Sequence, residues 1–202
     1  MMSQIPCDVC DPLALAAMLR SDPALGARWT TLPRRTFQTG APLQRAGDSA
    51  TRCWLVNHGV VRFFYLNEQG TERNRSFHGP GSWVGGSLPP LVVPSPYAIE
   101  ALSQVDAVEL DYGTLRQWQT AHPHLDGVLA QAMGHVFTQQ AHREAELLSL
   151  TAQERYASFL AAYGALAPQI PQHQVASYLG ISPVSLSRIR ARMGIADGQR
   201  GA

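Results

Sequence analysis

The sequence predicts an α+β protein with an N-terminal double-stranded β-helix or jelly roll, one long helix and a C-terminal helix-turn-helix. Three observations predict it. Short strand-like runs separated by turn residues fill positions 34 to 111, a proline-free segment with helical spacing follows, and two short helices flank a glycine near the end. The expected units are 1–122 for the roll, 123–150 for the long helix and 151–202 for the helix-turn-helix, with its wing reduced or absent.

The predicted roll begins with two strand-like runs, Cys53 to Val56 and Val60 to Leu66, on either side of the turn Asn57-His58-Gly59. After the turn "NEQG", the partly polar "TERNRSFH" is expected to return as a strand. "YAIEAL" and "VELD" supply the last strands. Between them, "GPGSWVGGSLPP" is expected to break the regular structure altogether. Many short strands at this spacing are typical of a barrel or jelly roll.

The helical part starts after Asp111, which is expected to cap the short helix "YGTLRQWQTA". A longer helix should then run from His124 to about Leu150. Much of its apolar spacing is 3 or 4, so a second copy of the helix would cover it and we expect a parallel homodimer. Packing of the helix on its own roll is the alternative. The apolar or small positions are Leu125, Leu129, Ala132, Val136, Leu147 and Leu150.

A capping box, "TAQE", occupies residues 151 to 154, so a new helix is expected to begin at Thr151. We place the hinge between the two halves there. In the following "PQHQVASYLGISPVSLSRIRARMG", Gly180 should end one helix in the left-handed conformation. Ser182 is a good N-cap for the next helix, and Pro183 suits its first position. Ala176 is small where the helices must cross, and their joint apolar positions are Val175, Tyr178, Leu179, Leu186, Ile189 and Met193.

The last helix carries polar and basic side chains on its other faces. Residues 182 to 202 contain four arginines and one aspartate, a local excess of +3, whereas the whole chain has a net charge of +1. A double-stranded DNA operator is the natural partner of such a patch. An ordinary helical hairpin with a solvated basic face is the alternative. The candidate DNA-binding residues are Ser182, Pro183, Val184, Ser185, Ser187, Arg188, Arg190, Arg192 and His173.

Composition narrows the remaining classes. No stretch approaches the roughly 20 apolar residues of a membrane span, and the N-terminus lacks a signal-like pattern, so we expect a cytoplasmic protein with no membrane partner. Three cysteines are too few for a disulfide scaffold. All 16 basic residues are arginine, which indicates compositional bias rather than mechanism.

The order of these units resembles the Crp/Fnr family of bacterial transcription regulators. "GAPLQRAGD" and "VNHGVVRFF" resemble early turns of the family's roll, "AQERYASFLAAY" the helix leading into its DNA-binding domain, and "GISPVSLSRIRARM" its recognition helix. The resemblance implies that Arg188 reaches base edges, where its planar fork can bond guanine O6 and N7, while Ser182 and Ser185 lie near phosphates. Pro183 and Val184 stand where familiar members carry polar base-reading residues, which implies a different sequence preference.

The corresponding ligand loop departs from the family. Cyclic-nucleotide-binding members use a glycine-glutamate pair and a downstream arginine, but here Gly86 takes the glutamate place and no lysine or arginine occurs from Ser76 to Leu115. A buried phosphate would lack a counter-charge. We therefore expect an apolar or aromatic effector other than cyclic AMP, or a vestigial site; side chains that simply fill the roll are the alternative. The candidate pocket residues are Arg62, Arg75, Trp83, Gly85, Gly86, Ser87 and Tyr97.

No catalytic residue, metal ligand or cofactor is expected, and hence no enzymatic activity. Two alternatives remain. The "CDVC" of Cys7 and Cys10, with Cys53, would suit an iron-sulfur or thiol redox sensor, although a cluster normally takes four thiolates. A metal-dependent cupin-like enzyme would share the roll, but His58 and His78 do not form a convincing ligand set. The expected partners are DNA and a second copy of the chain; a small-molecule effector and RNA polymerase are further candidates.

Overall fold

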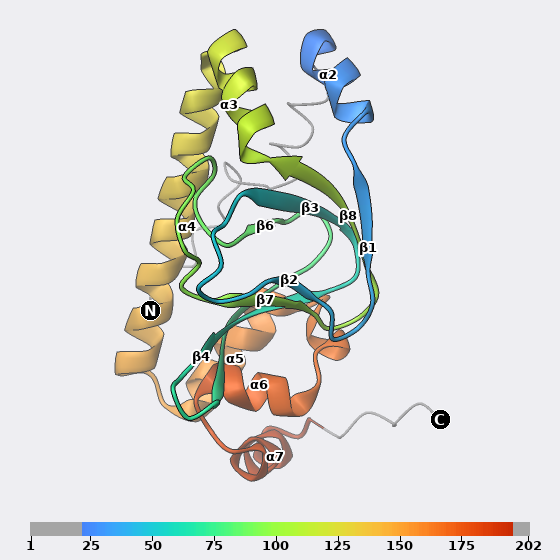
Figure 1. The fold of residues 1–202 in the computed structure, drawn as a ribbon. Helices are drawn as coiled ribbons and strands as arrows, with labels where there is room; N and C mark the ends of the chain where they lie inside the picture. Colours follow the sequence, from blue (N-terminus) through green and yellow to red (C-terminus); the bar gives the residue numbers. More distant parts are fainter. Residues whose placement is uncertain (1–21, 196–202) are drawn as a thin grey trace.

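The structure is a computed structural model that describes residues 22–195. Two four-stranded antiparallel sheets form a roll, a 26-residue helix runs along one side of it, and short helices follow at the C-terminal end (Figure 1). The predicted α+β class, with its jelly roll, long helix and helix-turn-helix, is confirmed. The wing prediction concerns residues after Ile195, which lie outside the described range.

The two sheets enclose an apolar interior. Sheet A has the strand order β1-β8-β3-β6, and sheet B has the order β2-β7-β4-β5. Trp54 and Val84 from sheet A meet Phe63 and Ile99 from sheet B in one buried cluster. The strands are β1 (Arg34–Phe37), β2 (Pro42–Gln44), β3 (Arg52–His58), β4 (Val61–Leu66), β5 (Glu72–His78), β6 (Trp83–Gly85), β7 (Ala98–Ala101) and β8 (Val105–Asp111).

The predicted turn between β3 and β4 depends on one glycine. Gly59 has φ of +89°, and a Cβ there would lie 2.1 Å from the carbonyl oxygen of Gln104. Any other residue would therefore need the left-handed conformation and would also collide with the neighbouring backbone. The turn fixes which faces of β4 point inward, with Phe63 in the interior and Arg62 on the outer side.

The irregular segment predicted at 79 to 90 is wrong in part. Trp83–Gly85 forms strand β6, which pairs with β3 from Cys53 to Leu55. Gly79, Gly81, Gly85 and Gly86 weaken the local strand pattern. The hydrogen bonds that define the strand come from β3, which is distant in the sequence. Strands β1 and β2 and helix α2 (Pro23–Thr30) are also not among the predicted elements, although Asp22 caps α2 and Pro23 stands at its first position, as Ser182 and Pro183 do for α7 (Pro183–Arg192).

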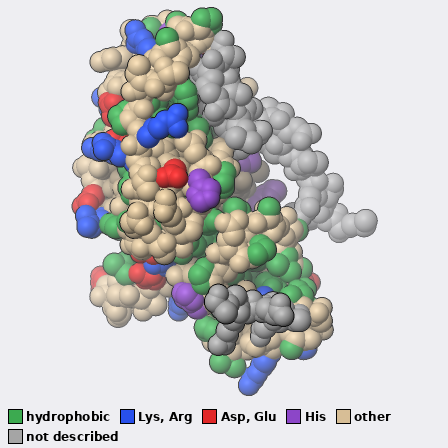
Figure 2. Space-filling view, turned by 90° about the vertical axis from the view of Figure 1, so that its right-hand side faces the viewer, with side chains coloured by type: hydrophobic (Ala, Val, Ile, Leu, Met, Phe, Trp, Pro, Cys, Tyr) green, Lys and Arg blue, Asp and Glu red, His purple; other side chains and the backbone are tan. Residues whose placement is uncertain are grey.

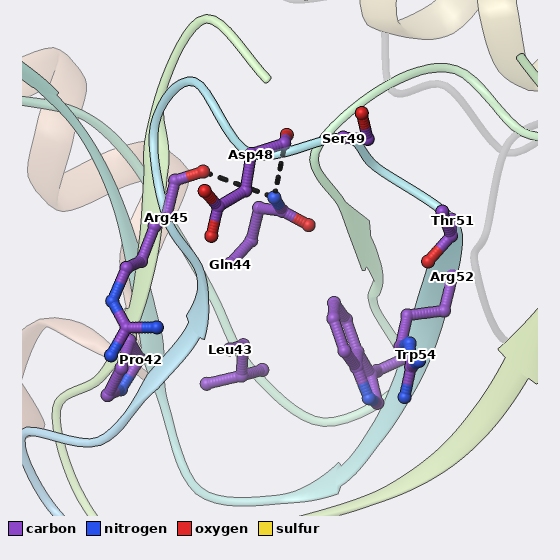
Figure 3. A pocket seen from close by; sticks show the side chains of 9 residues that line it. All are labelled: Pro42, Leu43, Gln44, Arg45, Asp48, Ser49, Thr51, Arg52 and Trp54. Carbon is purple, nitrogen blue, oxygen red and sulfur yellow. Dashed lines mark hydrogen bonds between the residues drawn. The ribbon is translucent and has the colours of Figure 1, made fainter. Parts of the chain in front are cut away.

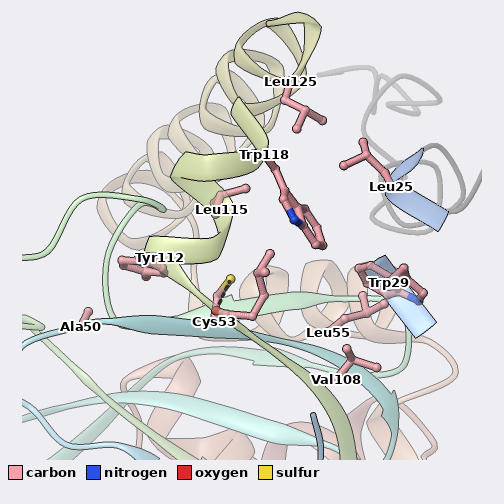
Figure 4. Close-up of a cluster of buried hydrophobic side chains, with 11 residues drawn as sticks. Leu25, Trp29, Ala50, Cys53, Leu55, Val108, Tyr112, Leu115, Trp118 and Leu125 are labelled. Atoms are coloured by element: carbon pink, nitrogen blue, oxygen red, sulfur yellow. Dashed lines mark hydrogen bonds between the residues drawn. The ribbon is translucent and has the colours of Figure 1, made fainter. Parts of the chain in front are cut away.

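The outer face of sheet A is covered by α2, by α3 (Tyr112–Ala121) and by the first turns of α4 (His124–Ser149). Leu25 and Trp29 of α2 meet Leu115 and Trp118 of α3 over this face (Figure 4). The predicted cap of α3 is confirmed, because Asp111 Oδ1 accepts a hydrogen bond from the amide of Thr114 at 2.9 Å.

The long helix α4 divides along its length. Leu125 is buried in the cluster over sheet A and Leu129 packs against it, so the expectation that these two belong to a dimer seam is wrong: their own roll covers them. Beyond them the helix exposes an apolar stripe. Among residues 22–195, no helix is long and apolar enough to cross a membrane, α4 included. The exposed apolar side chains of α4 are Met133, Val136, Phe137, Leu147 and Leu148.

The last helices form a helix-turn-helix unit beneath sheet B (Figure 1). The predicted capping box is confirmed: Thr151 Oγ1 accepts from the amide of Glu154, and the Glu154 carboxylate accepts from the amide of Thr151. In Figure 1, this unit lies on the opposite side of the roll from α2 and α3. Its elements are α5 (Ala152–Tyr163), η1 (Ala167–Gln169), α6 (Gln172–Leu179) and α7 (Pro183–Arg192).

Candidate DNA-binding surface and effector site

The turn between α6 and α7 has the local chemistry predicted from sequence. Gly180 is left-handed at φ 73° and ψ 29°, and the amide of Ile181 donates to the carbonyl of Ala176 at 3.0 Å. Ser182 caps α7, with Oγ accepting from the amide of Ser185 at 3.1 Å, and Pro183 follows it. Ala176 is fully buried where the helices cross. These contacts fix the angle of α7 to α6.

Helix α7 buries Leu186 and Ile189 and turns its other faces outward. Val184 is 61 % exposed, and Ser187, Arg188 and Arg192 are also exposed. In Figure 1, α7 lies at the lower end of the molecule, farther from the sheets than α6, and a basic side chain projects from this end in Figure 2. The outward faces therefore offer basic and small polar groups at a surface that the roll does not block.

The arginines of α7 are not equivalent. Arg190 Nη1 donates to Tyr156 Oη and to Gln172 Oε1, both at 3.1 Å, so this side chain ties α7 to α5 and α6. Arg188 and Arg192 are exposed instead. The sequence pattern of basic residues could not separate these roles, because Tyr156 lies 34 positions earlier. His173 is exposed in the first turn of α6, and Ser185 is partly buried near the cap.

One part of the predicted effector region gathers inside the roll, next to α4. The ring of Tyr97 stacks on Phe63 at 5.1 Å, and its hydroxyl donates to the carbonyl of Gly85 at 3.0 Å. Arg75 lies over the Tyr97 ring, with its guanidinium carbon 4.7 Å from the ring centroid. When the Gln140 amide is oriented with its oxygen toward β5, it accepts from Arg75 Nε at 3.1 Å. Arg75 thus contacts both the roll and α4.

This arrangement brings Arg75, one of the two arginines of the predicted pocket, to Tyr97, and so places beside the ring the cation that the ligand loop itself lacks. The stretch from Ser76 to Leu115 has no lysine or arginine, but β5 brings Arg75, just before it, to the ring of Tyr97. His78, two residues past Ser76, packs on Phe63 with ring centroids 4.5 Å apart. Burial and, to a smaller degree, the charge of Arg75 together lower the pKa of His78 to about 4, so the imidazole is neutral near pH 7.

Other predicted pocket residues lie elsewhere. Arg62 faces outward toward α6, because alternate residues of β4 point to opposite sides of the sheet. Trp83 packs edge-on against Trp29 on the outer face of sheet A, at 5.8 Å. Ser87 Oγ contacts Tyr112 Oη at 3.2 Å. A Cβ on Gly86 would lie 2.8 Å from Gln44 Cγ and 2.9 Å from Ser95 Cβ, so this position is closely packed.

A separate cavity of about 230 Å³ opens between β2, the loop after it and β3 (Figure 3). The amide of Gln44 closes its upper end by donating to the carbonyls of Arg45 and Asp48, both at 3.1 Å. Leu43 and Trp54 lie at the opposite end in Figure 3. None of the seven predicted effector residues lines this cavity, which is bordered by Pro42, Leu43, Gln44, Arg45, Asp48, Ser49, Thr51, Arg52 and Trp54.

The cysteines divide as well. Cys7 and Cys10 lie outside the described residues. Cys53 is buried beneath α3, and burial raises the pKa of its thiol well above the ordinary range. A cluster ligand has to be a thiolate, so Cys53 does not fit that role and instead fills the core. Across residues 22–195, no three His, Cys, Asp or Glu side chains come together in a way that could hold a metal ion.

Known proteins share this architecture. Residues 34–122 match the family described as the cyclic nucleotide-binding domain. The transcriptional activator protein FnrA of Stutzerimonas stutzeri is 27 % identical over 169 residues, which are 78 % of this chain and 69 % of that protein. The anaerobic regulatory protein of Aggregatibacter actinomycetemcomitans is 24 % identical over 79 % of this chain and 66 % of its own. The chain therefore spans about two thirds of the length of these relatives.

Two solved structures have a similar fold. FixK2 from Bradyrhizobium japonicum has a TM-score of 0.75 and 20 % identity, covering 85 % of this chain and 90 % of that one. The c-di-GMP responsive global regulator CLP of Xanthomonas campestris has a TM-score of 0.68 and 19 % identity, covering 88 % and 94 %. Matches of 85 % and 88 % are larger than any one part of the chain, so both include residues of the roll and of the helical part.

Proposed function

Because this chain belongs to the Crp/Fnr family of transcription regulators, we propose that it binds operator DNA as a homodimer, with α7 in the major groove. One observation carries the proposal. The first two turns of α7 are capped by Ser182, begin with Pro183 and expose Val184, Ser187 and Arg188. A capped helix N-terminus with short side chains can approach DNA closely, and its dipole favours phosphate.

The roles within α7 follow from its packing. Arg188 is exposed and can bond O6 and N7 of a guanine with two parallel hydrogen bonds. Val184 offers an apolar surface that suits a thymine methyl group. The exposed Arg192 and His173 are the candidates for backbone-phosphate contacts, while Arg190 orients the helix through Tyr156 and Gln172. RNA polymerase is the partner that a DNA-bound regulator of this kind would address.

Selection of the purified protein on a randomised double-stranded DNA library, followed by affinity measurement, tests this proposal. Wild type should enrich a two-fold symmetric sequence. Arg188→Ala should lose about 1–3 kcal/mol on that sequence and little on unrelated DNA. Arg192→Ala should weaken both DNAs to a similar degree, because a phosphate contact carries no sequence information. Equal losses for Arg188→Ala on both DNAs, or no enriched sequence, would contradict the proposal.

We also propose that the effector of this regulator is a planar or apolar compound and not cyclic AMP. The cluster of Tyr97, Phe63 and Arg75 groups two stacked aromatic rings and one cation next to α4. The position of the family's glutamate is filled by Gly86, and the close approach of Gln44 and Ser95 leaves no space for a ribose-binding side chain. Because Arg75 contacts Gln140 of α4, a compound bound there could shift the long helix.

Calorimetry distinguishes these ligands. Cyclic AMP and cyclic GMP should give no binding heat at micromolar concentrations. Binding of either nucleotide that is lost in Tyr97→Ala would overturn the effector proposal while leaving DNA binding untouched. Metal analysis of the purified protein addresses the redox alternative, since stoichiometric iron would favour a sensor that uses Cys7 and Cys10.

A further inference from the structure

We propose that Arg62, Asn74 and Gln174 act as positioning residues that hold the helix-turn-helix on its own roll and thereby set the distance between the two DNA half-sites that the dimer recognises. This inference rests on the proposed function and names the residues that orient it. The side chains of Arg62 and Asn74 come from the neighbouring strands β4 and β5, and Gln174 comes from α6, 100 positions after Asn74.

Arg62 is the centre of this contact. Its side chain is 5 % exposed, although arginine is almost never fully buried without partners. Two carboxylates neutralise it: Nη1 lies 2.6 Å from Glu72 Oε2, and Nη2 lies 2.9 Å from Glu100 Oε1. The guanidinium also lies over the Phe64 ring at 4.0 Å. Every one of these partners belongs to the roll, so the roll fixes the position of the guanidinium before α6 arrives.

The guanidinium then reaches across to α6. Arg62 Nη1 donates to Gln174 Oε1 at 3.2 Å, and Asn74 Nδ2 donates to the same oxygen at 2.6 Å and to the Gln174 carbonyl at 2.9 Å. The backbone N–H of Asn74 donates to Ser177 Oγ at 3.1 Å. Because hydrogen bonds depend on direction, this set accepts one orientation of α6, whereas apolar contact alone would tolerate sliding.

Two further contacts hold the same orientation. Phe77 of β5 packs against the rings of Phe159, Tyr163 and Tyr178, with centroids 5.6 to 6.2 Å apart. Gly79 lets the unit come close: a Cβ there would lie 2.6 Å from Leu166 Cδ2. On the other side, Arg143 of α4 donates to the carbonyl of Tyr178 and lies over its ring at 3.8 Å. The roll and α4 therefore contact α6 from two sides and together restrict its orientation.

These contacts to α6 leave the outward face of α7 exposed. The face of α6 that holds Gln174 and Ser177 points to β5, while the exposed side chains of α7 lie at the far end of the unit. In a dimer joined through α4, each α7 is then fixed to its roll and so to the two-fold axis. Half-sites one base pair closer or farther apart differ by 3.4 Å and roughly a tenth of a turn, which a fixed pair of helices cannot follow.

The experiment compares affinities for the operator selected from a random library with affinities for the same operator after one base pair is inserted between, or deleted from, its halves. The readout is the ratio of the two affinities. Wild type should prefer the selected spacing on the order of tenfold or more. In Gln174→Ala the ratio should fall toward one, because only direction-dependent contacts to α6 are lost. A general loss of stability would lower both affinities and leave the ratio unchanged.

Three variants sharpen the result. Gln174→Glu keeps an acceptor for Arg62 and Asn74 and should retain the wild-type ratio. Gly79→Ala should reduce the ratio independently by pushing Leu166 away. Gln169→Ala, an exposed change in the same helical unit, is the matched control and should behave as wild type. If Gln174→Ala does not unfold cooperatively, Ser177→Ala replaces it, since it removes one hydroxyl.

The outcomes separate the inference from the proposed function. Gln174→Ala and Gly79→Ala variants that fold and keep the wild-type ratio would overturn the positioning role, as would a wild type that binds its operator equally well at every spacing. A wild type that enriches no DNA sequence would overturn the proposed function itself.

Discussion

The two outer faces of the roll are covered in chemically different ways. Sheet A lies under Trp118, Leu115 and Leu25, which form a continuous apolar layer from elements close to it in the sequence. Sheet B lies under α5 and α6, which arrive from far along the chain and combine aromatic rings with the buried Arg62 cluster. Apolar burial stabilises without fixing direction, whereas a buried polar cluster specifies one arrangement. The comparison indicates one face built for stability and one built for orientation.

The largest expected effect comes from the apolar cover. Trp118→Ala removes a fully buried indole from the layer between α3 and sheet A and should lower the free energy of unfolding by about 3–5 kcal/mol. Urea unfolding measures it. Gln117→Ala, an exposed neighbour on the same helix, is the control and should stay within about 0.5 kcal/mol of wild type. An unchanged midpoint for Trp118→Ala would mean that this cover contributes little.

The exposed apolar stripe in the middle of α4 offers the next test, because neither the helices over sheet A nor those over sheet B bury it. Phe137 is 76 % exposed and Val136 is 47 % exposed. Changing both to glutamate would place charges in a dimer seam and should weaken dimerisation by about 100-fold, seen as monomers in light scattering at micromolar concentration. Ala145→Glu, which lies about a third of a turn away from this stripe, should leave the dimer intact. Persistent dimers in the double variant would place the interface elsewhere.

An ion cluster on the rim of sheet A gives a pH-dependent effect. Burial by itself would raise the pKa of Glu109, but hydrogen bonds from Arg35 at 3.1 Å and Trp54 at 3.1 Å, with the charge of Arg52, keep it below its usual range. A lowered folded pKa means that the stabilisation is present above the ordinary glutamate range near pH 4 and is lost as pH falls through the folded value.

Glu109→Gln should therefore cost about 1–2 kcal/mol at pH 7, a figure reduced for the solvent exposure of both arginines, and progressively less below pH 4. Thermal unfolding from pH 3 to pH 7 measures this. Asp106→Asn, on the same strand, serves as the comparison. A cost that stays constant over this range would show that the charge of Glu109 is not what stabilises the strand.

The smallest expected effect concerns the break between α4 and α5 at Thr151. Thr151→Ala removes the side-chain half of the capping box and should cost about 1 kcal/mol of local stability. Because α5 starts there, hydrogen exchange in its first turn should speed up, and operator affinity should change although Thr151 is not part of α7. Gln153→Ala, an exposed neighbour, should do neither. Unchanged affinity with or without a bound effector would leave the hinge prediction unsupported.

Local chemistry made the helix-turn-helix predictable. Each of its signals acts within four residues of the chain and can therefore be read from the local sequence: Gly180, Ser182, Pro183 and the capping box at Thr151. Strand β6 was missed because its hydrogen bonds come from β3, about 30 positions earlier. The predicted pocket contains both Arg75 and Tyr97, but the stacking of the guanidinium on the ring was not predicted, since β5 and β7 are joined to β4 on opposite edges and only the folded sheet brings the two side chains together.

The covering of sheet B was the least predictable part. Nothing near Arg62 in the sequence announces that it will be buried, and Gln174 reads as an ordinary polar residue on a short helix. Their contact arises only when two separately folding patterns meet over a distance of about 100 residues. In the same way, Leu125 and Leu129 fit a dimer seam by spacing, but α3 folds back and covers them first. Spacing identifies an apolar face and leaves open what covers it.

The distribution of aromatic residues makes the two covers separately visible to light. All four tryptophans, Trp29, Trp54, Trp83 and Trp118, belong to the roll, whereas residues 123–202 contain tyrosine and phenylalanine only. Indole emission therefore reports on the roll and on the layer over sheet A. Phenol absorbance from Tyr156, Tyr163 and Tyr178 reports on the cover of sheet B. A spectroscopist can thus follow the release of one cover without labels, as a change in tyrosine signal at constant tryptophan emission.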